Sequence, residues 1–534
     1  MRASLRSVSF ALSFCFSACG GDNHPGMDTA AGASSLGGSA GQNSARGGSA
    51  GSVSIETGGS SGATSGGAGG SAQGTAASAF RYGFNAGYPN PKFNDQDLAA
   101  LGVRAGATSE RVSLPEQHLE RWGYDIEVAD VKAYRTLGMG SLVGFLTSPT
   151  RAHSTAPADA SDDQVGQYIP KNLYEPITTA NGEVNPNNYW ASYVYRTVST
   201  YGSWIDTWEI WNEPDWVSDW KVTEAWATRA PSAADLPRFH GSIFDYVRML
   251  RVSSVAAKLA NPNAKIATGG IGYPNFLDAI VRYSDEPKAG AIDADHPATG
   301  KAYFDVVSFH HYPIYTPGNS EAGVDGFMKQ RQALGALVDP SRVLGWECTE
   351  TGAPHLPLDG IPSGSAYAKN YLLKVMALAP SADLGGVHWF VLSDAKAAGQ
   401  STDPYAFMGL YAPVASLSTP SEAELSESGV AYATLSQLLR GAHYDGIATS
   451  ALGLPGTARG IAYRSADDAR ILVLWAIAPA DSETASTSVE LASPRTLRQH
   501  AWDFSKTGQS QLLTPVNGVV TLALEATPRI FVEQ

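Results

Sequence analysis

The sequence predicts an α/β fold, a (β/α)8 TIM barrel followed by a C-terminal all-β sandwich module. Between residues 80 and 440, eight short apolar runs alternate with longer helical patterns. From residue 441 onward, short strands follow one another without a helical pattern between them. Repeated βαβ units form a parallel sheet, and eight units over about 350 residues fit a closed barrel with long loops.

The predicted barrel strands are short apolar runs bounded by turn signals or helical patterns. They lie at residues 82–85, 102–112, 139–146, 205–211, 265–271, 303–309, 343–349 and 386–392. The clearest helix between them spans residues 239–259, where Ile243, Val247 and Leu250 fall at helical spacing. A doubly wound open sheet is the alternative. It would normally carry a Gly-rich phosphate loop after an early strand, and residues 83–87 are too sparse in glycine for that role.

The C-terminal residues 441–534 predict a β-sandwich packed on the barrel. Their short strands are separated by Gly, Pro, Asp or Asn, which is typical of an all-β module. The predicted strands lie at residues 461–464, 470–477, 488–491, 498–504, 519–524 and 529–533.

The first 78 residues predict export and tethering. Residues 1–19 combine Arg2 and Arg6 with a short apolar stretch, which is typical of a signal peptide. The stretch ends in Phe-Ser-Ala-Cys, which resembles a bacterial lipobox with Cys19 as the lipidated residue; an ordinary cleaved signal peptide is the alternative. Residues 20–78 consist mainly of Gly, Ser and Ala, and predict a disordered tether. We therefore expect a lipid-anchored cell-envelope or surface protein, or otherwise a secreted one, that meets the membrane only through its anchor.

Charge and cysteine content exclude several classes of partner and site. The formal net charge is −14, and an acidic chain repels the phosphates of nucleic acid. Cys15 and Cys19 lie in the leader, so Cys348 has no intrachain partner for a disulfide or a cysteine metal site. Trp, Tyr and Phe make up 10% of the chain, which suits stacking on sugar rings but is also common in large barrels.

The strongest local motif is the apolar run from Trp208 that ends in Trp-Asn-Glu-Pro at residues 211–214. Pro214 cannot donate to a central sheet ladder, so the strand should stop there. This places Glu213 at the carboxyl end of a strand, where barrel enzymes carry their active sites. The alternative for a single Glu in this position is a strand-end cap.

A second strand ends in Trp-Glu-Cys-Thr-Glu-Thr-Gly at residues 346–352, and two glutamates compete for a role there. Side chains alternate along a strand. If Glu350 points into the barrel mouth, Trp346 and Cys348 should do the same, and Glu347 should face the helices as a buried or ion-paired structural residue. We favour Glu350 because it lies nearer the strand end. Cys348 is interpreted as a core residue rather than a nucleophile.

A third motif contains two adjacent histidines, His310 and His311, at the end of a strand. Paired histidines can bind a metal, but neighbouring strand residues point to opposite faces. The pair should therefore not chelate one ion, and we expect no metal. One histidine should line the site with Tyr312, while the other packs or reaches solvent.

Together these motifs resemble glycoside hydrolase clan A, closest to family 39, with families 5 and 30 possible. The resemblance rests on Trp-Asn-Glu-Pro after the fourth strand, His-x-Tyr after the sixth and Thr-Glu-x-Gly after the seventh, and it covers residues 80–440. It implies a retaining glycosidase without a cofactor. Glu213 would be the acid/base and Glu350 the nucleophile.

The resemblance also implies roles for five supporting residues. Asn212 would bond the sugar 2-hydroxyl, Arg111 would support the nucleophile, and Tyr312 would hydrogen-bond Glu350. His310 fits the histidine of the His-x-Tyr motif, and Trp389 on the eighth strand would form the sugar platform. The strand before Arg111 is more polar than the family pattern.

Two other functions remain open from the sequence. A non-catalytic carbohydrate-binding lipoprotein could keep the barrel and its aromatic residues, but it could lose either glutamate, and both are present. A metal-dependent hydrolase or lyase would use His310, His311 and nearby acids.

Overall fold

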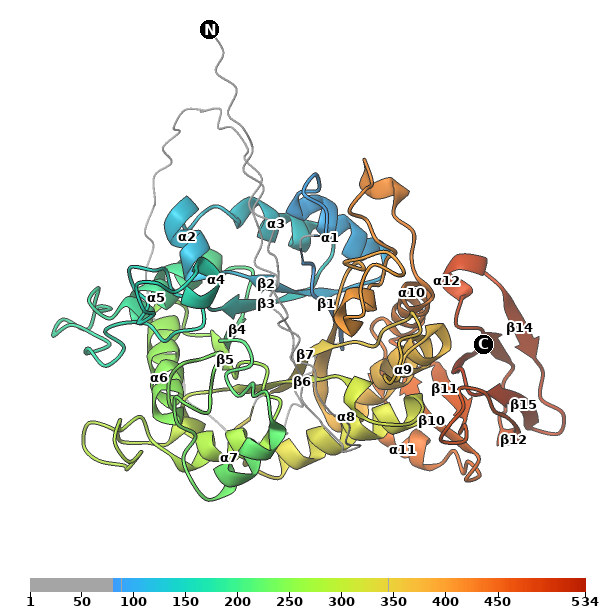
Figure 1. Cartoon of the computed structure of the whole chain (residues 1–534). Coiled ribbons are helices and arrows are strands. Elements are labelled where there is room, and N and C mark those ends of the chain that lie inside the picture. Colours follow the sequence, from blue (N-terminus) through green and yellow to red (C-terminus); the bar gives the residue numbers. More distant parts are fainter. Residues whose placement is uncertain (1–79, 88, 344) are drawn as a thin grey trace, which may run out of the picture.

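The computed structural model describes residues 80–534 except 88 and 344, and these residues form a barrel and a smaller β-module (Figure 1). The predicted signal peptide, tether and lipidated Cys19 lie outside the described residues and stay predictions. Within the described part, no helix combines the length and hydropathy needed to cross a membrane.

Eight parallel strands close into a barrel in chain order, as the sequence predicts. The last strand pairs with the first, from Arg81 opposite Gly386 to Phe84 opposite Trp389. The strands are β1 (Arg81–Phe84), β2 (Ser109–Ser113), β3 (Ser141–Leu146), β4 (Thr207–Ile210), β5 (Lys265–Ala267), β6 (Val306–His311), β7 (Gly345–Thr351) and β8 (Leu384–Trp389).

The expectation of a strand over residues 102–112 is wrong for its first part. Residues 102–104 end helix α1 (Asp95–Arg104), which a capping box between Asn94 and Asp97 starts. Leu98 and Leu101 bury one face of this helix. Gly106 then adopts a φ of +97°, which turns the chain into β2.

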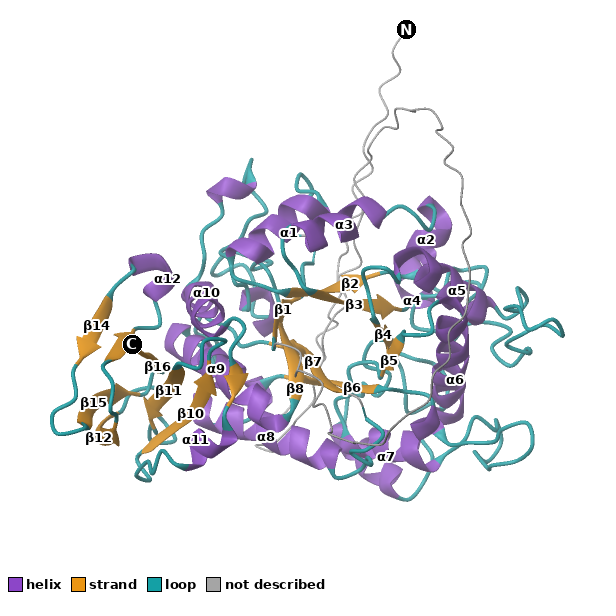
Figure 2. Ribbon diagram, turned by 180° about the vertical axis from the view of Figure 1, so that it is seen from behind, coloured by secondary structure: helices purple, strands orange, loops and turns teal. Residues whose placement is uncertain are grey.

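Helices surround the barrel, and α9 and α10 lie between it and the C-terminal module (Figures 1 and 2). The predicted helix over residues 239–259 is α6, which begins at a capping box between Ser242 and Asp245. The other helices around the barrel are α2 (Glu116–Trp122), α3 (Val128–Thr136), α4 (Asp162–Val165), α5 (Tyr189–Tyr201), α6 (Ile243–Ala260), α7 (Pro274–Arg282), α8 (Ser320–Gly335), α9 (Ser365–Leu378) and α10 (Glu427–Leu439).

The C-terminal module is built from antiparallel strands in a six-stranded and a two-stranded sheet. Apolar side chains from both sheets, among them Leu472, Leu474 and Leu522, share one buried cluster. The strands are β9 (His443–Tyr444), β10 (Ala458–Arg464), β11 (Arg470–Ala476), β12 (Ser486–Ala492), β13 (Leu497–His500), β14 (Ser510–Leu513), β15 (Val519–Glu525) and β16 (Arg529–Glu533).

Two helices in this module correct the expectation of an all-strand region. Helix α11 (Gly446–Ser450) is capped by Asp445, and α12 (Phe504–Thr507) takes the end of the strand predicted at 498–504. The sequence prediction also missed β9 and β14, which are short edge strands with little apolar patterning.

The module is fixed to the barrel through α8. Glu321 on that helix accepts a hydrogen bond from the buried indole N–H of Trp475. It also forms an ion pair with Arg459, with 3.2 Å between the nitrogen and the oxygen. At the start of the same helix, the Asn319 amide donates to the carbonyl of Pro479 at 2.7 Å. The β-module therefore packs on the outside of the barrel.

A cluster of three acidic residues at the starts of α1 and α3 leads to a prediction about stability. Carboxylate oxygens of Asp95, Glu127 and Asp130 lie within 4.8 Å of one another. Burial, followed by the charges of Glu127 and Asp130, raises the pKa of Asp95 to about 7. An acid whose pKa is raised on folding loses stability as the pH rises from about 4 to about 7.

Asp95→Asn is therefore expected to raise the melting temperature at pH 8 by about 2–4 °C and to change it little at pH 4. Thermal unfolding at both pH values checks this. The exposed Asp159→Asn is the matched control. The prediction would be contradicted if the melting temperature of Asp95→Asn at pH 8 rose no more than that of this control.

Candidate active site

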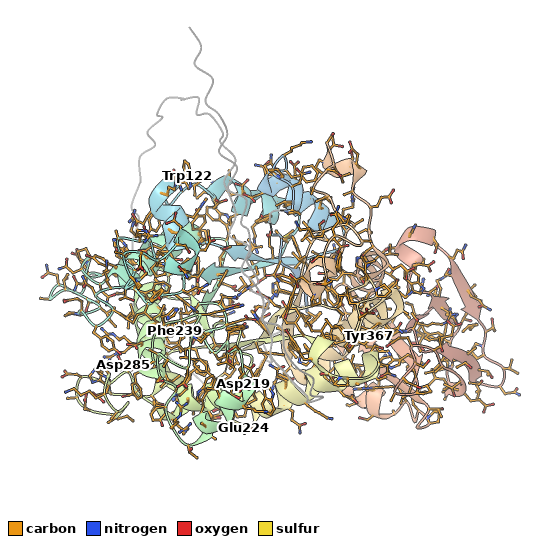
Figure 3. The ribbon with its side chains drawn as sticks, in the orientation of Figure 1. Trp122, Asp219, Glu224, Phe239, Asp285 and Tyr367 are labelled. Carbon is orange, nitrogen blue, oxygen red and sulfur yellow. The ribbon has the colours of Figure 1, made fainter. Side chains whose placement is uncertain are left out.

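The end of β4 holds Glu213 in an unusual backbone conformation. Trp211 and Glu213 have φ values of +72° and +45°, which L-residues rarely adopt. The Glu213 N–H donates to the carbonyl of Gly269 at 2.7 Å. Trp211 is 2% exposed and packs edge-on against Phe239, with 5.2 Å between ring centroids. Phe239, which is labelled in Figure 3, lies in the loop before α6. This packing holds the turn that directs the Glu213 side chain.

The end of β7 presents Glu350 to two donors, Arg111 on β2 and Tyr312 directly after β6. The Arg111 guanidinium lies 2.5 Å from Oε1, and the Tyr312 hydroxyl donates to Oε2 at 2.7 Å. Burial and the Glu350 charge raise the pKa of Tyr312 well above its usual range, so its hydroxyl keeps its proton. The two donors therefore hold both carboxylate oxygens of Glu350 in place.

His310 joins the two glutamates. Its Nδ1 lies 2.9 Å from Glu213 Oε1 and 3.7 Å from Glu350 Oε2. One side-chain ligand atom from each of these three residues lies within 4.8 Å of the other two. Gly270 makes room for the ring, because a Cβ there would lie 2.2 Å from His310 Nε2. The structure therefore brings Glu213 and Glu350 together at one mouth.

Arg111 on β2 connects the two halves of the site. One guanidinium nitrogen bonds Glu350, and the other bonds Glu209 at 2.5 Å and Asn212 at 2.7 Å. Burial lowers the pKa of Arg111, but the charges of Glu209 and Glu350 outweigh this and raise it above its usual value. Arg111 therefore stays charged beside both carboxylates.

A cation also approaches the outer side of Glu213. Arg238 lies 3.3 Å from its Oε2 and stacks on the Trp216 ring, 4.0 Å from the centroid. Asp215, two residues after Glu213, is buried and accepts the backbone N–H groups of Gly272 and Tyr273. Burial raises the pKa of Asp215 to about 7.

The expectation that Glu347 faces the helices is wrong, although its ion pairing is as expected. It pairs with Arg81 on β1, across Gly386 on β8. Trp346 instead packs under Arg331 of α8, 3.6 Å from guanidinium to ring centroid. Cys348 is fully buried and is a core residue.

The barrel interior accounts for this orientation. A Cβ at Gly83 would lie 2.2 Å from the ring of His388, and His388 Nε2 is 3.1 Å from Ser109 Oγ, two residues before Arg111. Arg81 is two residues before Gly83 and therefore points into the same interior. Irregular register in β7, after residues 346 and 348, breaks the simple alternation and lets Glu347 and Glu350 both face inward.

The predicted sugar platform at Trp389 is wrong, because this side chain is 0% exposed. Its indole N–H donates to the carbonyl of Met408 at 2.7 Å, and its ring lies beside Tyr371 of α9. The next residue, Phe390, packs edge-on against Tyr312, with 6.0 Å between centroids. The aromatic residue on the mouth side is therefore displaced by one position from the predicted one.

The two histidines separate as expected for neighbouring strand residues. His311 Nδ1 lies 2.7 Å from Gln330 Oε1 on α8, whereas His310 faces Glu213. A metal site from both histidines is therefore excluded. Glu213, His310 and Glu350 could supply three ligand atoms, but the Arg111 guanidinium beside Glu350 and Arg238 beside Glu213 oppose a divalent cation.

The sequence did not predict that four further residues belong to the site. Glu209 bonds Arg111, Thr349 bonds His310, Ser308 bonds Thr349, and Arg238 pairs with Glu213. Glu209 is an acidic residue in an apolar strand, and a buried arginine such as Arg111 needs more than one partner, so this pair could have been anticipated. Arg238 lies in a loop before α6 and carries no pattern that would reveal it.

Sequence comparison identifies no relative: no family model matches the chain, and no curated protein matches it. Structural comparison finds solved structures with a similar fold. A family 39 glycoside hydrolase from Bacteroides cellulosilyticus WH2 superposes with a TM-score of 0.56 at 17% identity, over 85% of this chain and 81% of that one.

Two further structures have the same likeness. The catalytic domain of a family 30 xylanase C from Talaromyces cellulolyticus gives a TM-score of 0.51 at 15% identity, covering 86% of this chain and 97% of that one. A monomeric β-xylosidase from Caulobacter crescentus CB15 gives 0.51 at 14% identity, covering 85% and 95%.

These neighbours define the class of the fold: a glycoside hydrolase-like barrel with a β-module. Families 39 and 30 are among those that the sequence motifs resemble. At 11–17% identity, the likeness shows the fold, and the chemistry must be argued from the site itself.

Proposed function

We propose that this protein is a retaining glycoside hydrolase that cleaves O-glycosidic bonds of a polysaccharide or oligosaccharide. The observation that carries the proposal is the pair Glu213 and Glu350, of which one carboxylate oxygen each lies within 4.8 Å of the other at the carboxyl ends of β4 and β7. Retaining enzymes place their two carboxyl groups about 5–5.5 Å apart, whereas inverting enzymes need about 6.5–9.5 Å for a water.

In the first step, Glu350 attacks the anomeric carbon and Glu213 donates its proton to the leaving oxygen. Arg111 and Tyr312 donate to the two carboxylate oxygens of Glu350 and fix its orientation. The glycosidic bond breaks, and a covalent glycosyl-enzyme ester forms on Glu350.

In the second step, the ionised Glu213 takes a proton from water, which attacks the same carbon and releases the sugar. Arg238, 3.3 Å from Glu213, stabilises this ionised form. Glu213 regains its proton and Glu350 its charge, so the site returns to its starting state.

A non-catalytic carbohydrate-binding protein is the alternative. It would need the mouth and its aromatic residues, but it would need neither a paired nucleophile nor an acid beside it. Both carboxylates are present and each has dedicated hydrogen-bond partners, which favours catalysis.

Covalent labelling distinguishes the two functions. A panel of plant and bacterial polysaccharides first identifies the sugar through the released products. The matching 2-deoxy-2-fluoro glycoside with a good leaving group should then label one peptide containing Glu350, detected by mass spectrometry. A label on another residue, or sugar binding without turnover or labelling, would overturn the proposal.

A further inference from the structure

Four buried hydrogen bonds connect Glu213 with Glu209 on β4. His310 Nδ1 lies 2.9 Å from Glu213 Oε1, and His310 Nε2 lies 3.1 Å from Thr349 Oγ1. Thr349 Oγ1 is 2.6 Å from Ser308 Oγ, which lies 3.3 Å from Glu209 Oε2. All five side chains are buried, with at most 2% of each residue exposed.

Glu209 determines which group donates in each hydrogen bond of this series. This carboxylate is ion-paired with Arg111 at 2.5 Å, so both of its oxygens are acceptors. Among the described residues, Ser308 is the donor to Oε2. A buried carboxylate oxygen without a donor is costly, so Ser308 directs its proton to Glu209.

Each following bond is then determined. Ser308 has a single hydroxyl proton, so it must accept from Thr349. Thr349 has then used its own proton, and His310 Nε2 must be the donor to Thr349 Oγ1. Burial lowers the pKa of His310 to about 4, so at neutral pH the imidazole is neutral and carries one N–H.

This leaves His310 Nδ1 without a proton, 2.9 Å from Glu213 Oε1. Two acceptors cannot form a hydrogen bond, so Glu213 must supply the proton. We propose that Ser308 and Thr349 are positioning residues that, with Glu209, hold His310 as its Nε2–H tautomer and so keep Glu213 protonated for the first step. This inference rests on the proposed function.

Other groups that face Glu213 act in both directions. The Glu350 charge and the nearby Asp215 favour the protonated form, whereas Arg238 on the outer side favours the ionised form. Tyr273, at the start of α7, also faces Glu213. Burial, followed by the charges of Asp215 and Glu213, raises the pKa of Tyr273 above its usual value, so its hydroxyl is uncharged.

The charged groups that face His310 act on its pKa in both directions. The Glu350 charge favours protonation of the ring, the Arg111 charge opposes it, and Glu209 favours it more weakly. Burial of the ring outweighs all three, so the neutral form persists and the chain through Thr349 decides which nitrogen carries the proton.

The tautomer of His310 can be read directly in the full-length protein labelled with ¹⁵N in its histidine rings. Two-bond ¹H–¹⁵N spectra should show a protonated Nε2 and an unprotonated Nδ1 for His310, assigned by loss of the signal in His310→Gln. The Nδ1–H tautomer would overturn the inference. This readout does not depend on activity, so it remains valid if no substrate is found.

A pair of Thr349 variants tests the effect on the acid. Thr349→Val removes the hydroxyl and keeps the shape, whereas Thr349→Ser keeps the hydroxyl. In Thr349→Val, the high-pH limb of kcat/KM should move down by at least about half a pH unit. kcat should fall about tenfold for a glycoside with a poor leaving group, and much less for an activated aryl glycoside. Thr349→Ser should restore both.

Equal pH profiles and equal leaving-group dependence in Thr349→Val and Thr349→Ser would overturn the positioning role while the wild type still hydrolyses and labels at Glu350. Failure of the proposed function looks different: the wild type itself would neither turn over nor label. If Thr349→Val does not fold, Ser308→Ala against Ser308→Thr provides the same comparison.

Discussion

Glu350→Gln is expected to lower kcat by at least about 10³-fold while the fold is retained. The amide keeps the shape of the side chain and can still bond Arg111 and Tyr312, but it cannot form the glycosyl-enzyme ester. The rate with the best polysaccharide or aryl glycoside, together with circular dichroism and thermal unfolding, measures both parts of the prediction.

Glu347→Gln is the matched control, since it lies three residues earlier on the same strand. It leaves Arg81 without its partner ion inside the barrel, so we expect a loss of about 3–5 kcal/mol in the free energy of unfolding. Turnover at low temperature should remain. The reverse pattern, with Glu347→Gln inactive and Glu350→Gln active, would show that Glu350 is not the nucleophile.

Arg111→Met is expected to lose both stability and activity. The variant leaves Glu209, which is 0% exposed, without its ion pair, and removes a donor from Glu350. Breaking a buried pair from one side costs about 3–5 kcal/mol. Denaturant unfolding measures this loss, and kcat/KM at a temperature where the variant is folded measures the effect on Glu350.

Arg196→Met provides the comparison, because Arg196 pairs with Glu120 on the surface and is half exposed. Exposed pairs contribute about 0.2–1 kcal/mol, and this residue touches neither glutamate. If the two variants lose similar stability and Arg111→Met keeps wild-type kcat/KM, the proposal that Arg111 connects the two halves of the site is contradicted.

Apolar patterning was enough to place the two central glutamates. Glu213 and Glu350 both follow apolar strands, and the closed barrel brings the carboxyl ends of those strands to one mouth. The eight-strand barrel and the β-module were predicted for the same reason, because both depend on buried periodicity that the sequence displays directly.

Side-chain directions inside the barrel were harder to predict. Alternation counted back from Glu350 placed Glu347 on the helix side, but irregular register in β7 turns it inward to Arg81. On β8, the family resemblance predicted a sugar platform at Trp389, but the strand directs Trp389 to α9. A bulge leaves no composition signal, so periodicity cannot locate it.

The hydrogen-bond chain through Ser308 and Thr349 was not predictable at all. These are common polar residues on buried strands, and their meaning depends on which donors and acceptors meet across β6 and β7. Helix α1 was partly missed for a different reason. Residues 102–108 are mostly small or apolar, so no change of composition marks the end of the helix, and the turn at Gly106 separates it from β2.

The anomeric configuration of the first product is the most direct test of two carboxylates sharing one bond. Once a substrate is known, ¹H NMR during the first minutes of hydrolysis shows the sugar before it mutarotates. Because one carboxylate oxygen of Glu213 lies within 4.8 Å of one of Glu350, which fits the spacing of retaining rather than inverting enzymes, the product should have the configuration of the substrate. An inverted first product would contradict the account.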